Sequence, residues 1–237
     1  MGSIVNRVSG ILILVFVMLA TSPGPASAQQ TVNVTVGHFS MPRVDRSPTD
    51  ILNIEHHDLA FDISEFSNWS LGGEWLVPLG AFVEAGAGIA FGQRTVPTYH
   101  VLAVNQDGSR IERELGLRQV PMEVTVRVLP LRQSYRVQPY AGGGIAWIKW
   151  RFSESGDFAT PSGRIFRDEL HAATGSAIGP VMVFGMRVAG DTMAFGVESR
   201  YQHASGSFGP EFARVVNPDI DLDGWTLQVT AGMRLGK

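Results

Sequence analysis

The 237-residue sequence predicts an all-β fold, an eight-stranded antiparallel up-and-down barrel. The clearest observation is segment 225–235, where every odd position is apolar and every even position is polar, glycine or charged. Successive side chains of a strand point to opposite faces, so this period of two predicts one apolar and one polar face. Seven earlier segments repeat the pattern, and the connections between segments alternate between short and long. Both features are typical of a barrel whose strands run up and down.

The first 28 residues are predicted to be a secretory signal peptide. Arg7 provides a positive start, residues 11–20 form an apolar stretch, and Ala26-Ser27-Ala28 provides a cleavage site. The apolar stretch is roughly half of the ~20 residues that a spanning helix needs. We therefore expect the barrel domain to cover residues 29–237.

The composition narrows the class of protein. The chain has no cysteine, so an exported domain of this sequence must rely on core burial or on barrel closure instead of disulfides. The net charge is −3, and removal of residues 1–28 takes away Arg7 and no acidic residue, giving −4. This balance predicts no nucleic-acid partner.

The first three strands are predicted at 32–40, 69–77 and 82–92. In the first, valine alternates with polar residues or glycine, and in the next two, apolar residues alternate with glycine and with Glu74 or Glu84. The segment Pro78-Leu79-Gly80 is a tight-turn sequence between the second and third strands.

The next three strands are predicted at 120–129, 137–152 and 178–188. The fourth and sixth alternate regularly. In the fifth, the large apolar residues Ile148, Trp150 and Phe152 lie on the face of Gly142 and Gly144, opposite the face that Ile145 occupies earlier. Either a bulge or the exit of the strand from a bilayer explains this change of face.

The seventh and eighth strands are predicted at 193–202 and 225–235. Connections after the second, fourth and sixth strands have a few residues, whereas the other four are long: 41–68, 93–119, 153–177 and 203–224. Short turns at one end and long polar loops at the other match bacterial outer-membrane barrels, whose turns face the periplasm. An even number of strands also places both ends of the barrel domain on the turn side.

A membrane barrel explains the two faces of these strands. A closed barrel pairs every backbone polar group, and strands of about 9–11 tilted residues cross the hydrocarbon layer. The aromatic residues Trp69, Phe91, Tyr201 and Trp225 fall at the loop-side ends of apolar faces, as an interfacial girdle requires, and Phe195 falls near the turn side.

The polar faces carry equal numbers of acidic and basic side chains. Charges facing lipid cost about 2–4 kcal/mol at mid-depth, and buried unpaired charges are also unfavourable, so we expect salt bridges inside a plugged lumen. Glycines on the same faces leave room for the long side chains. The predicted lumen charge network consists of Glu74, Glu84, Glu123, Arg127, Arg187, Glu198, Arg200 and Arg234.

Two motifs carry a family resemblance. Residues 137–144 (Val-Gln-Pro-Tyr-Ala-Gly-Gly-Gly) resemble the PY-x-G-x-G signature of bacterial outer-membrane barrels of the OmpA-type transmembrane superfamily, and residues 224–235 are similar to their closing strand. The resemblance implies a porin-like, eight-stranded barrel in the outer membrane of a Gram-negative bacterium. One departure is the ending Leu235-Gly236-Lys237, where such barrels usually end on an aromatic residue that the assembly machinery recognises.

One short segment suggests catalysis. His203-Ala204-Ser205 weakly resembles the His-x-Ser pair of outer-membrane lipid A deacylase barrels, in which histidine is the base and serine the nucleophile. Glu211 or Asp221 would have to orient the histidine. The asparagine that follows in that family is Gly206 here, so a polar strand end is the simpler interpretation.

Two segments suggest metal ligands. Asp219, Asp221, Asp223 and Gly224 match the first half of an EF-hand loop, but Thr230 stands where the bidentate glutamate belongs. His56-His57-Asp58 is a poor chelate, because adjacent histidines in a strand-like loop point in opposite directions. Gly142-Gly143-Gly144 is no phosphate loop, since no helix start follows it.

The leading hypothesis is therefore a non-enzymatic, monomeric outer-membrane barrel with a structural or surface-interaction role, without cofactor, metal or catalytic residues. Its expected partners are outer-membrane lipid, the assembly machinery and an unidentified extracellular partner. Three alternatives remain: a narrow diffusion channel for small solutes, a soluble lipocalin-like carrier, and a lipid A deacylase-type enzyme.

Overall fold

The computed structural model describes residues 29–43, 46–105, 107–159, 165–209 and 218–236. The predicted signal peptide and the candidate acid Glu211 lie outside the described residues. Within them, no helix is long and apolar enough to cross a membrane.

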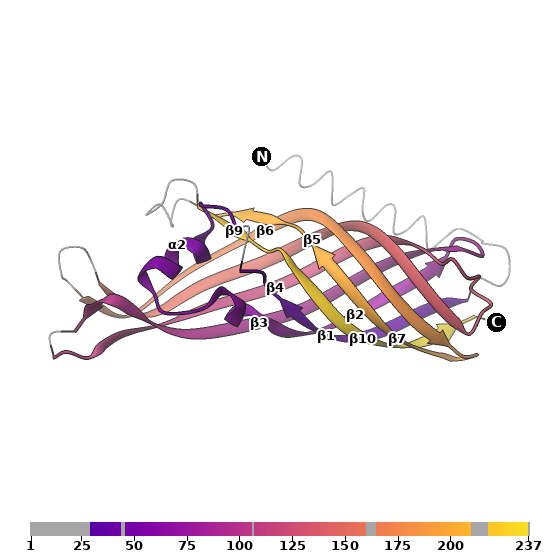
Figure 1. The fold of residues 1–237 in the computed structure, drawn as a ribbon, viewed down its shortest axis with the longest axis horizontal. Coiled ribbons are helices and arrows are strands. Elements are labelled where there is room, and N and C mark those ends of the chain that lie inside the picture. The colour runs from indigo at the N-terminus through magenta and orange to yellow at the C-terminus, as the bar shows by residue number, and fades with distance from the viewer. Residues whose placement is uncertain (1–28, 44–45, 106, 160–164, 210–217, 237) are drawn as a thin grey trace.

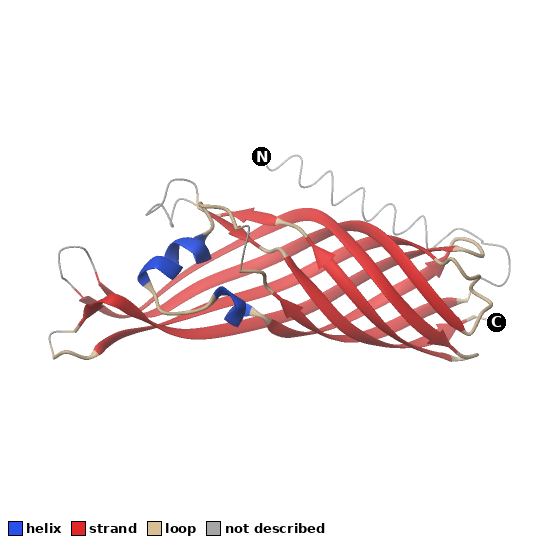
Figure 2. Ribbon diagram, in the orientation of Figure 1, coloured by secondary structure: helices blue, strands red, loops and turns tan. Residues whose placement is uncertain are grey.

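Eight antiparallel strands close into a ring, which confirms the predicted fold class (Figures 1 and 2). The order around the ring is β1-β10-β7-β6-β5-β4-β3-β2, and β1 closes the barrel against β10 from the pair Gln30–Leu235 to the pair Ser40–Trp225. The barrel strands are β1 (Gln30–Ser40), β2 (Asn68–Pro78), β3 (Val83–Val104), β4 (Arg110–Val128), β5 (Val137–Ala159), β6 (Ile165–Ala189), β7 (Met193–Gln202) and β10 (Gly224–Leu235).

The four central strands are much longer than predicted. β3, β4, β5 and β6 have 22, 19, 23 and 25 residues, whereas β1, β2, β7 and β10 have 10 to 12. The predicted long loops 93–119 and 153–177 are therefore wrong, because most of their residues continue two hairpins beyond the shorter strands (Figure 1). In these extensions the apolar residues move to the opposite face of the strand. The alternation in the sequence therefore did not predict them as continuations of the same strands.

On the turn side, the exposed face of the barrel is apolar. Valines 124, 126 and 128 of β4 are 43–54% exposed, and Met182, Phe184 and Met186 of β6 are 46–53% exposed. The alternate residues point inward and include buried glutamates and arginines. We call this exposed apolar band the apolar belt. It surrounds the barrel over the length of the short strands, as a lipid-facing surface does.

Aromatic side chains mark the edge of the apolar belt that lies farther from the short turns. Trp69 is 73% exposed and makes an edge contact with His38, while the rings of Tyr201 and Trp225 lie 5.0 Å apart. Phe91 pairs with Leu71, two residues along β2 from Trp69. These residues come from four strands and lie at the ends predicted for an interfacial girdle.

Beyond the apolar belt, the two faces of the long strands exchange polarity. On β4, Arg110, Glu112, Glu114 and Arg118 point outward, and Ile111, Leu115 and Leu117 are buried inside. On β5, Ile148, Trp150 and Phe152 point inward. The β4–β5 register is continuous from Val128–Ala141 to Arg113–Gly156. The change of face predicted in β5 is therefore the exit of the strand from the apolar belt, and no bulge causes it.

The first and last connections fill the half of the barrel that lies farther from the short turns. The first contains α2 (Ile51–Asp58) and the 3-10 helix η1 (Ile63–Phe66), and the last contains the small sheet of β8 (Ser205–Ser207) and β9 (Asp219–Asp221). Their side chains Leu52, Phe66 and Ile220 are fully buried against the inward-facing residues of β3 to β6. We call this core the apolar cluster.

A buried ion pair holds the two connections together. Arg46 Nε donates to Asp50 Oδ2 at 2.5 Å, and both side chains are buried. Asp50 also caps α2 by accepting from Asn53 N at 3.2 Å, and its Oδ1 accepts from Asp221 N. Arg46 Nη2 donates to the Asp221 carbonyl at 2.8 Å. Burial raises the pKa of Asp50, and the nearby Arg46 opposes that rise.

Replacement of Arg46 should therefore loosen both connections. An Arg46→Ala variant leaves the Asp50 carboxylate buried without its counter-ion, which costs about 3–5 kcal/mol. We expect cleavage of these segments by thermolysin in detergent to become about 100-fold faster or more. Because folding raises the pKa of Asp50, the folded segment binds a proton more tightly, so acidification should partly restore protection.

The matched control is Arg43→Ala. Arg43 pairs with Asp62 at 2.7 Å, but its side chain is 67% exposed. Exposed ion pairs contribute little, so proteolysis should change by no more than a few fold. Equal sensitivity of the two variants would contradict a structural role for the Arg46–Asp50 pair.

Candidate functional site: a closed polar network in the lumen

The lumen within the apolar belt contains charged side chains from five strands. Each lies at an inward-facing position of an alternating strand, and all are at most 9% exposed. The structure brings together seven of the eight predicted residues, which we call the polar network: Glu74, Glu84, Glu123, Arg127, Arg187, Glu198 and Arg200.

Arg127 of β4 lies at the centre of the polar network. Its Nη2 contacts Glu74 Oε1 of β2 and lies 2.9 Å from Glu198 Oε2 of β7. Its Nη1 lies 3.9 Å from Glu84 Oε1 of β3. The guanidinium carbon also lies 4.9 Å from the centroid of the Tyr140 ring. One fully buried arginine thus connects four strands across the barrel.

Arg187 of β6 forms the part of the polar network nearest the turns. Its Nη1 and Nη2 donate to Glu84 Oε1 and Oε2 at 3.0 and 2.6 Å, a bidentate arrangement. Its Nε donates to Gln138 Oε1 at 2.7 Å. Paired, charge-assisted bonds of this kind fix geometry as well as charge.

Arg200 of β7 forms the opposite part, toward the apolar cluster. Its Nη1 donates to Glu123 Oε1, its Nε donates to Glu198 Oε1 at 2.8 Å, and its Nη2 lies 3.1 Å from Glu74 Oε1. Glu74 and Glu198 therefore each contact both Arg127 and Arg200.

Neutral side chains complete the polar network. Tyr140 Oη donates to Glu198 Oε2 at 2.8 Å, Gln228 Nε2 donates to Glu198 Oε1 at 2.9 Å, and Asn33 Nδ2 donates to Glu74 Oε2 at 3.3 Å. Tyr140 belongs to the PY-x-G-x-G stretch, but nothing in the sequence assigned Tyr140, Gln228 or Asn33 to the lumen charge network. Their inward positions in alternating strands were the available signal, although the pattern does not reveal which glutamate each one contacts.

Inward-facing glycines leave room for the Tyr140 ring and for the close approach of β4 to β5. A Cβ at Gly185 would lie 2.5 Å from Cζ of Tyr140, and a Cβ at Gly142 would collide with the Val126 carbonyl oxygen and lie 2.9 Å from Cα of Arg127. This explains part of the PY-x-G-x-G pattern, since Tyr140 and Gly142 belong to it and side chains at these glycines would clash.

Four glutamates and three arginines leave the polar network with one formal negative charge. Within the described residues, Glu123 Oε2 is buried and has no hydrogen-bond partner. Glu123 lines a cavity of about 30 Å³ between the polar network and the apolar cluster. Gln119 Nε2 and Asn68 Oδ1, from two other lining residues, are also buried without partners. A cavity of this volume with several polar partners can hold a water molecule.

Arg234 does not join the polar network. Its Nη1 donates to the Gly190 carbonyl in the β6–β7 turn, and the side chain is only partly buried. The residue points inward, as predicted, but it lies four residues beyond Thr230, at the turn-side mouth. Alternation identifies the face of a residue and not its depth, which explains this difference.

The candidate catalytic histidine has a carboxylate partner that the sequence did not indicate. His203 Nδ1 lies 2.5 Å from Asp223 Oδ2, whereas Asp221 accepts from Ser47 N. Asp223 Oδ1 also accepts from Ala204 N at 2.8 Å, so this carboxylate connects the end of β7 to the start of β10. Ser205 is exposed, as is His203.

The candidate metal ligands point to separate partners. Asp219 Oδ2 accepts from Thr49 Oγ1, while Asp221 and Asp223 accept from Ser47 and Ala204 as described. Across the described ranges, no three histidine or acidic residues are grouped to hold a metal ion. The segment around His56 and His57 is helical, not strand-like as predicted, and both rings contact carbonyl oxygens of neighbouring residues.

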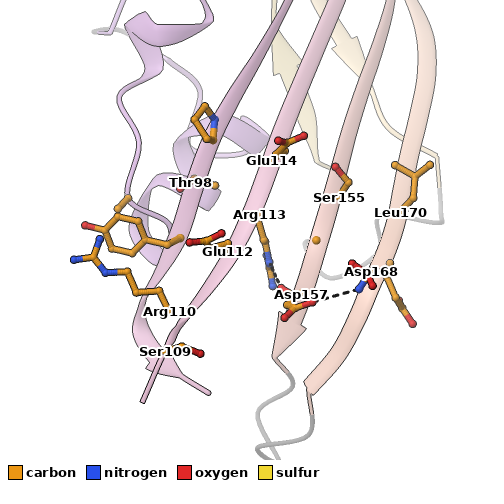
Figure 3. A pocket seen from close by; sticks show the side chains of 15 residues that line it. Thr98, Ser109, Arg110, Glu112, Arg113, Glu114, Ser155, Asp157, Asp168 and Leu170 are labelled. Carbon is orange, nitrogen blue, oxygen red and sulfur yellow. Dashed lines mark hydrogen bonds between the residues drawn. The ribbon is translucent and has the colours of Figure 1, made fainter. Parts of the chain in front are cut away.

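A larger recess lies at the outer tips of the long hairpins (Figure 3). It has a volume of about 1150 Å³, and Figure 3 shows Glu112, Arg113, Asp157 and Asp168 around it. The recess forms because β4 pairs with β5 only as far as Arg113–Gly156. The register of β5 against β6 shifts at that point, where Gly156 adopts φ +124°. Beyond it, the two hairpins separate.

A solved bacterial outer-membrane protein has a similar fold. No protein-family model and no curated protein sequence matches the chain. The chain is similar to the outer membrane protein OprG from Pseudomonas aeruginosa, with a TM-score of 0.55 and 12% identity over 90% of this chain and 98% of that chain.

Two further structures are similar at lower scores. Neisserial surface protein A gives a TM-score of 0.47 and 9% identity, covering 87% of this chain and 97% of that one. Ail of Yersinia pestis, in complex with sucrose octasulfate, gives 0.47 and 8% identity, covering 88% and 99%. The chain thus has the fold of eight-stranded outer-membrane β-barrels, as the family resemblance in its sequence predicts.

Removal of the central arginine should destabilise the barrel strongly. An Arg127→Met variant keeps most of the side-chain volume but leaves four buried glutamates with only two arginines, and removal of one partner of a buried ion pair costs about 3–5 kcal/mol. We expect the urea concentration at the midpoint of unfolding in detergent to fall clearly. Heat-modifiable migration measures the folded fraction at each urea concentration.

Arg234→Met is the matched control, because the same substitution is made at an inward arginine outside the polar network. It should change the midpoint little. Equal destabilisation by both substitutions would show that contact with Glu74, Glu84 and Glu198 does not determine the effect.

Proposed function

We propose that the chain is a non-enzymatic outer-membrane β-barrel with a closed lumen, which holds a rigid extension on the outer surface of the cell. The apolar belt, the predicted signal peptide and the fold shared with outer-membrane proteins support this location. The short turns and both ends of the barrel domain then lie on the periplasmic side.

Two successive barriers in the lumen support a closed barrel over a diffusion channel. The polar network crosses the lumen from β2 to β7, and the apolar cluster follows it toward the outside. Between them lies a cavity of only about 30 Å³. The interior of an eight-stranded barrel is just wide enough for its side chains, so the described part of the lumen leaves no continuous aqueous path.

The distribution of charge argues against a soluble lipocalin-like carrier. Such a carrier needs an apolar interior throughout and a polar exterior. Here the interior within the apolar belt contains Glu84, Arg127 and Glu198, each at most 1% exposed, while apolar side chains cover the exterior of the belt.

The long hairpins support a surface-interaction role. β3 to β6 extend well beyond the shorter strands, and the packed first and last connections brace them from inside (Figure 2). Their tips carry the recess in Figure 3, with Arg110 stacked on Tyr99 and Arg113 on Phe158. A firm, shaped surface of this kind loses little entropy on binding a partner.

Conductance tests the closed lumen. The purified, refolded chain in a planar bilayer should give no steady single-channel currents, because ions cannot pass both barriers. Its insertion should be verified in parallel by heat-modifiable migration and by recovery in the outer-membrane fraction. Steady currents from verified barrels would favour the channel, and a chain soluble without detergent would contradict the membrane barrel.

The His203–Asp223 contact favours one second candidate, a lipid A deacylase-type enzyme. An acid that orients a histidine beside an exposed serine is the arrangement of a nucleophilic triad. The same Asp223 accepts a hydrogen bond from the Ala204 backbone amide, which favours a structural role. We adopt this structural role. His203→Ala should therefore leave the acyl chains of lipid A unaltered in cells that produce the protein, as measured by mass spectrometry of lipid A. Loss of a deacylated lipid A species in this variant would establish the enzyme instead.

A further inference from the structure

A group of basic side chains lies on the outer face of β4 and β5, just above the apolar belt. Arg118, Lys149 and Arg151 are exposed and point outward. Below them on the same strands lie Val120 and Trp147, and Lys149 Nζ is 5.3 Å from the centroid of the Trp147 ring. The group therefore begins where the lipid-facing surface ends.

The two arginines face each other across neighbouring strands. Arg118 and Arg151 are a direct cross-strand pair, and Lys149 pairs with Val120 beside them. Like charges directly opposite each other destabilise a sheet. Within the described residues, neither arginine forms an ion pair. The next acidic residue on this face of β4, Glu114, lies two outward positions farther away.

Both arginines line a recess of about 220 Å³. Its lining offers hydrogen-bond donors and no carboxylate, and two leucines complete it. A Cβ at Gly116 would lie 2.5 Å from Ser153 Oγ, so the glycine keeps the recess open. The polar lining and this glycine are Gln93, Thr95, Gly116, Arg118, Arg151 and Ser153.

We propose that this recess, which we call the arginine recess, binds a phosphate group of a glycolipid in the outer leaflet. Two guanidinium groups, two hydroxyls and an amide suit the oxygens of a phosphate, to which arginine donates in bidentate fashion. The recess opens sideways at the edge of the apolar belt, where the headgroups of the outer leaflet would lie, and a lipid phosphate is therefore the source. This assignment rests on the proposed membrane location and orientation.

The test compares lipid A with and without its phosphates. Refolded protein in detergent micelles is titrated with diphosphoryl lipid A, and bound lipid is counted by native mass spectrometry. Arg118→Gln combined with Arg151→Gln should weaken binding about tenfold or more, because two charge-assisted contacts are lost. Dephosphorylated lipid A should bind both forms equally weakly.

Arg132→Gln combined with Arg136→Gln is the matched control. It makes the same charge change at exposed positions of the β4–β5 turn, at the opposite end of the barrel. Its affinity for diphosphoryl lipid A should equal that of the unaltered protein. Loss of affinity in this control, or unchanged affinity in the recess variant, would overturn the proposal.

Two further arms separate the source of the phosphate and the state of the barrel. Inorganic phosphate at millimolar concentration should not displace the lipid, and displacement that depends on Arg118 and Arg151 would show a site for free phosphate. Arg118→Lys with Arg151→Lys keeps the charge but removes the planar donors, so intermediate binding is expected. If the recess variant binds lipid as the unaltered protein does and both show heat-modifiable migration, the arginine recess alone is refuted. If the unaltered protein shows no such migration, the membrane barrel is refuted.

Discussion

The closure of β1 against β10 is the constraint on which the rest of the structure depends. A ring of eight strands leaves no unpaired edge, so each barrel strand has one enclosed face and one outer face. The enclosed face is narrow, and whatever lies on it must pack against side chains from the opposite side. The outer face carries the apolar belt, so the charges of the alternating strands are confined to the lumen. Strand closure therefore determines both the belt and the polar network.

Within this narrow space, burial makes mutual compensation necessary. Arg127, Glu84 and Glu198 are almost inaccessible, and a single unpaired charge at such a depth is strongly unfavourable. Shared contacts solve the problem, since Glu74 and Glu198 each contact two arginines. The same interactions hold β2, β3, β4, β6 and β7 at fixed depths relative to one another. The polar network thus closes the lumen and aligns the strands.

The surroundings change along the barrel axis, and the long strands change with them. Inside the apolar belt the interior is polar, whereas above it Leu115, Leu117 and Phe152 form an interior like that of a water-soluble protein. The first and last connections complete that interior, held by Arg46 and Asp50. At the boundary, Arg118 and Arg151 remain outside, and no described residue forms an ion pair with either of them. The proposed lipid phosphate would supply the negative charge that no described residue places beside these arginines.

The alternation of side chains in the sequence determined the fold class, the number of strands, the turn-side connections and the face of each charged residue, because these depend on local periodicity. It did not determine the full length of β3 to β6, where the pattern changes face beyond the apolar belt, or the helix around His56. The alternation also did not determine how deep a side chain lies in the lumen. Arg234 and Arg127 have equivalent inward positions, but only Arg127 connects four strands. The pairing of Arg127 with Glu74 and of His203 with Asp223 joins residues distant in the chain, and register and barrel closure alone bring them together.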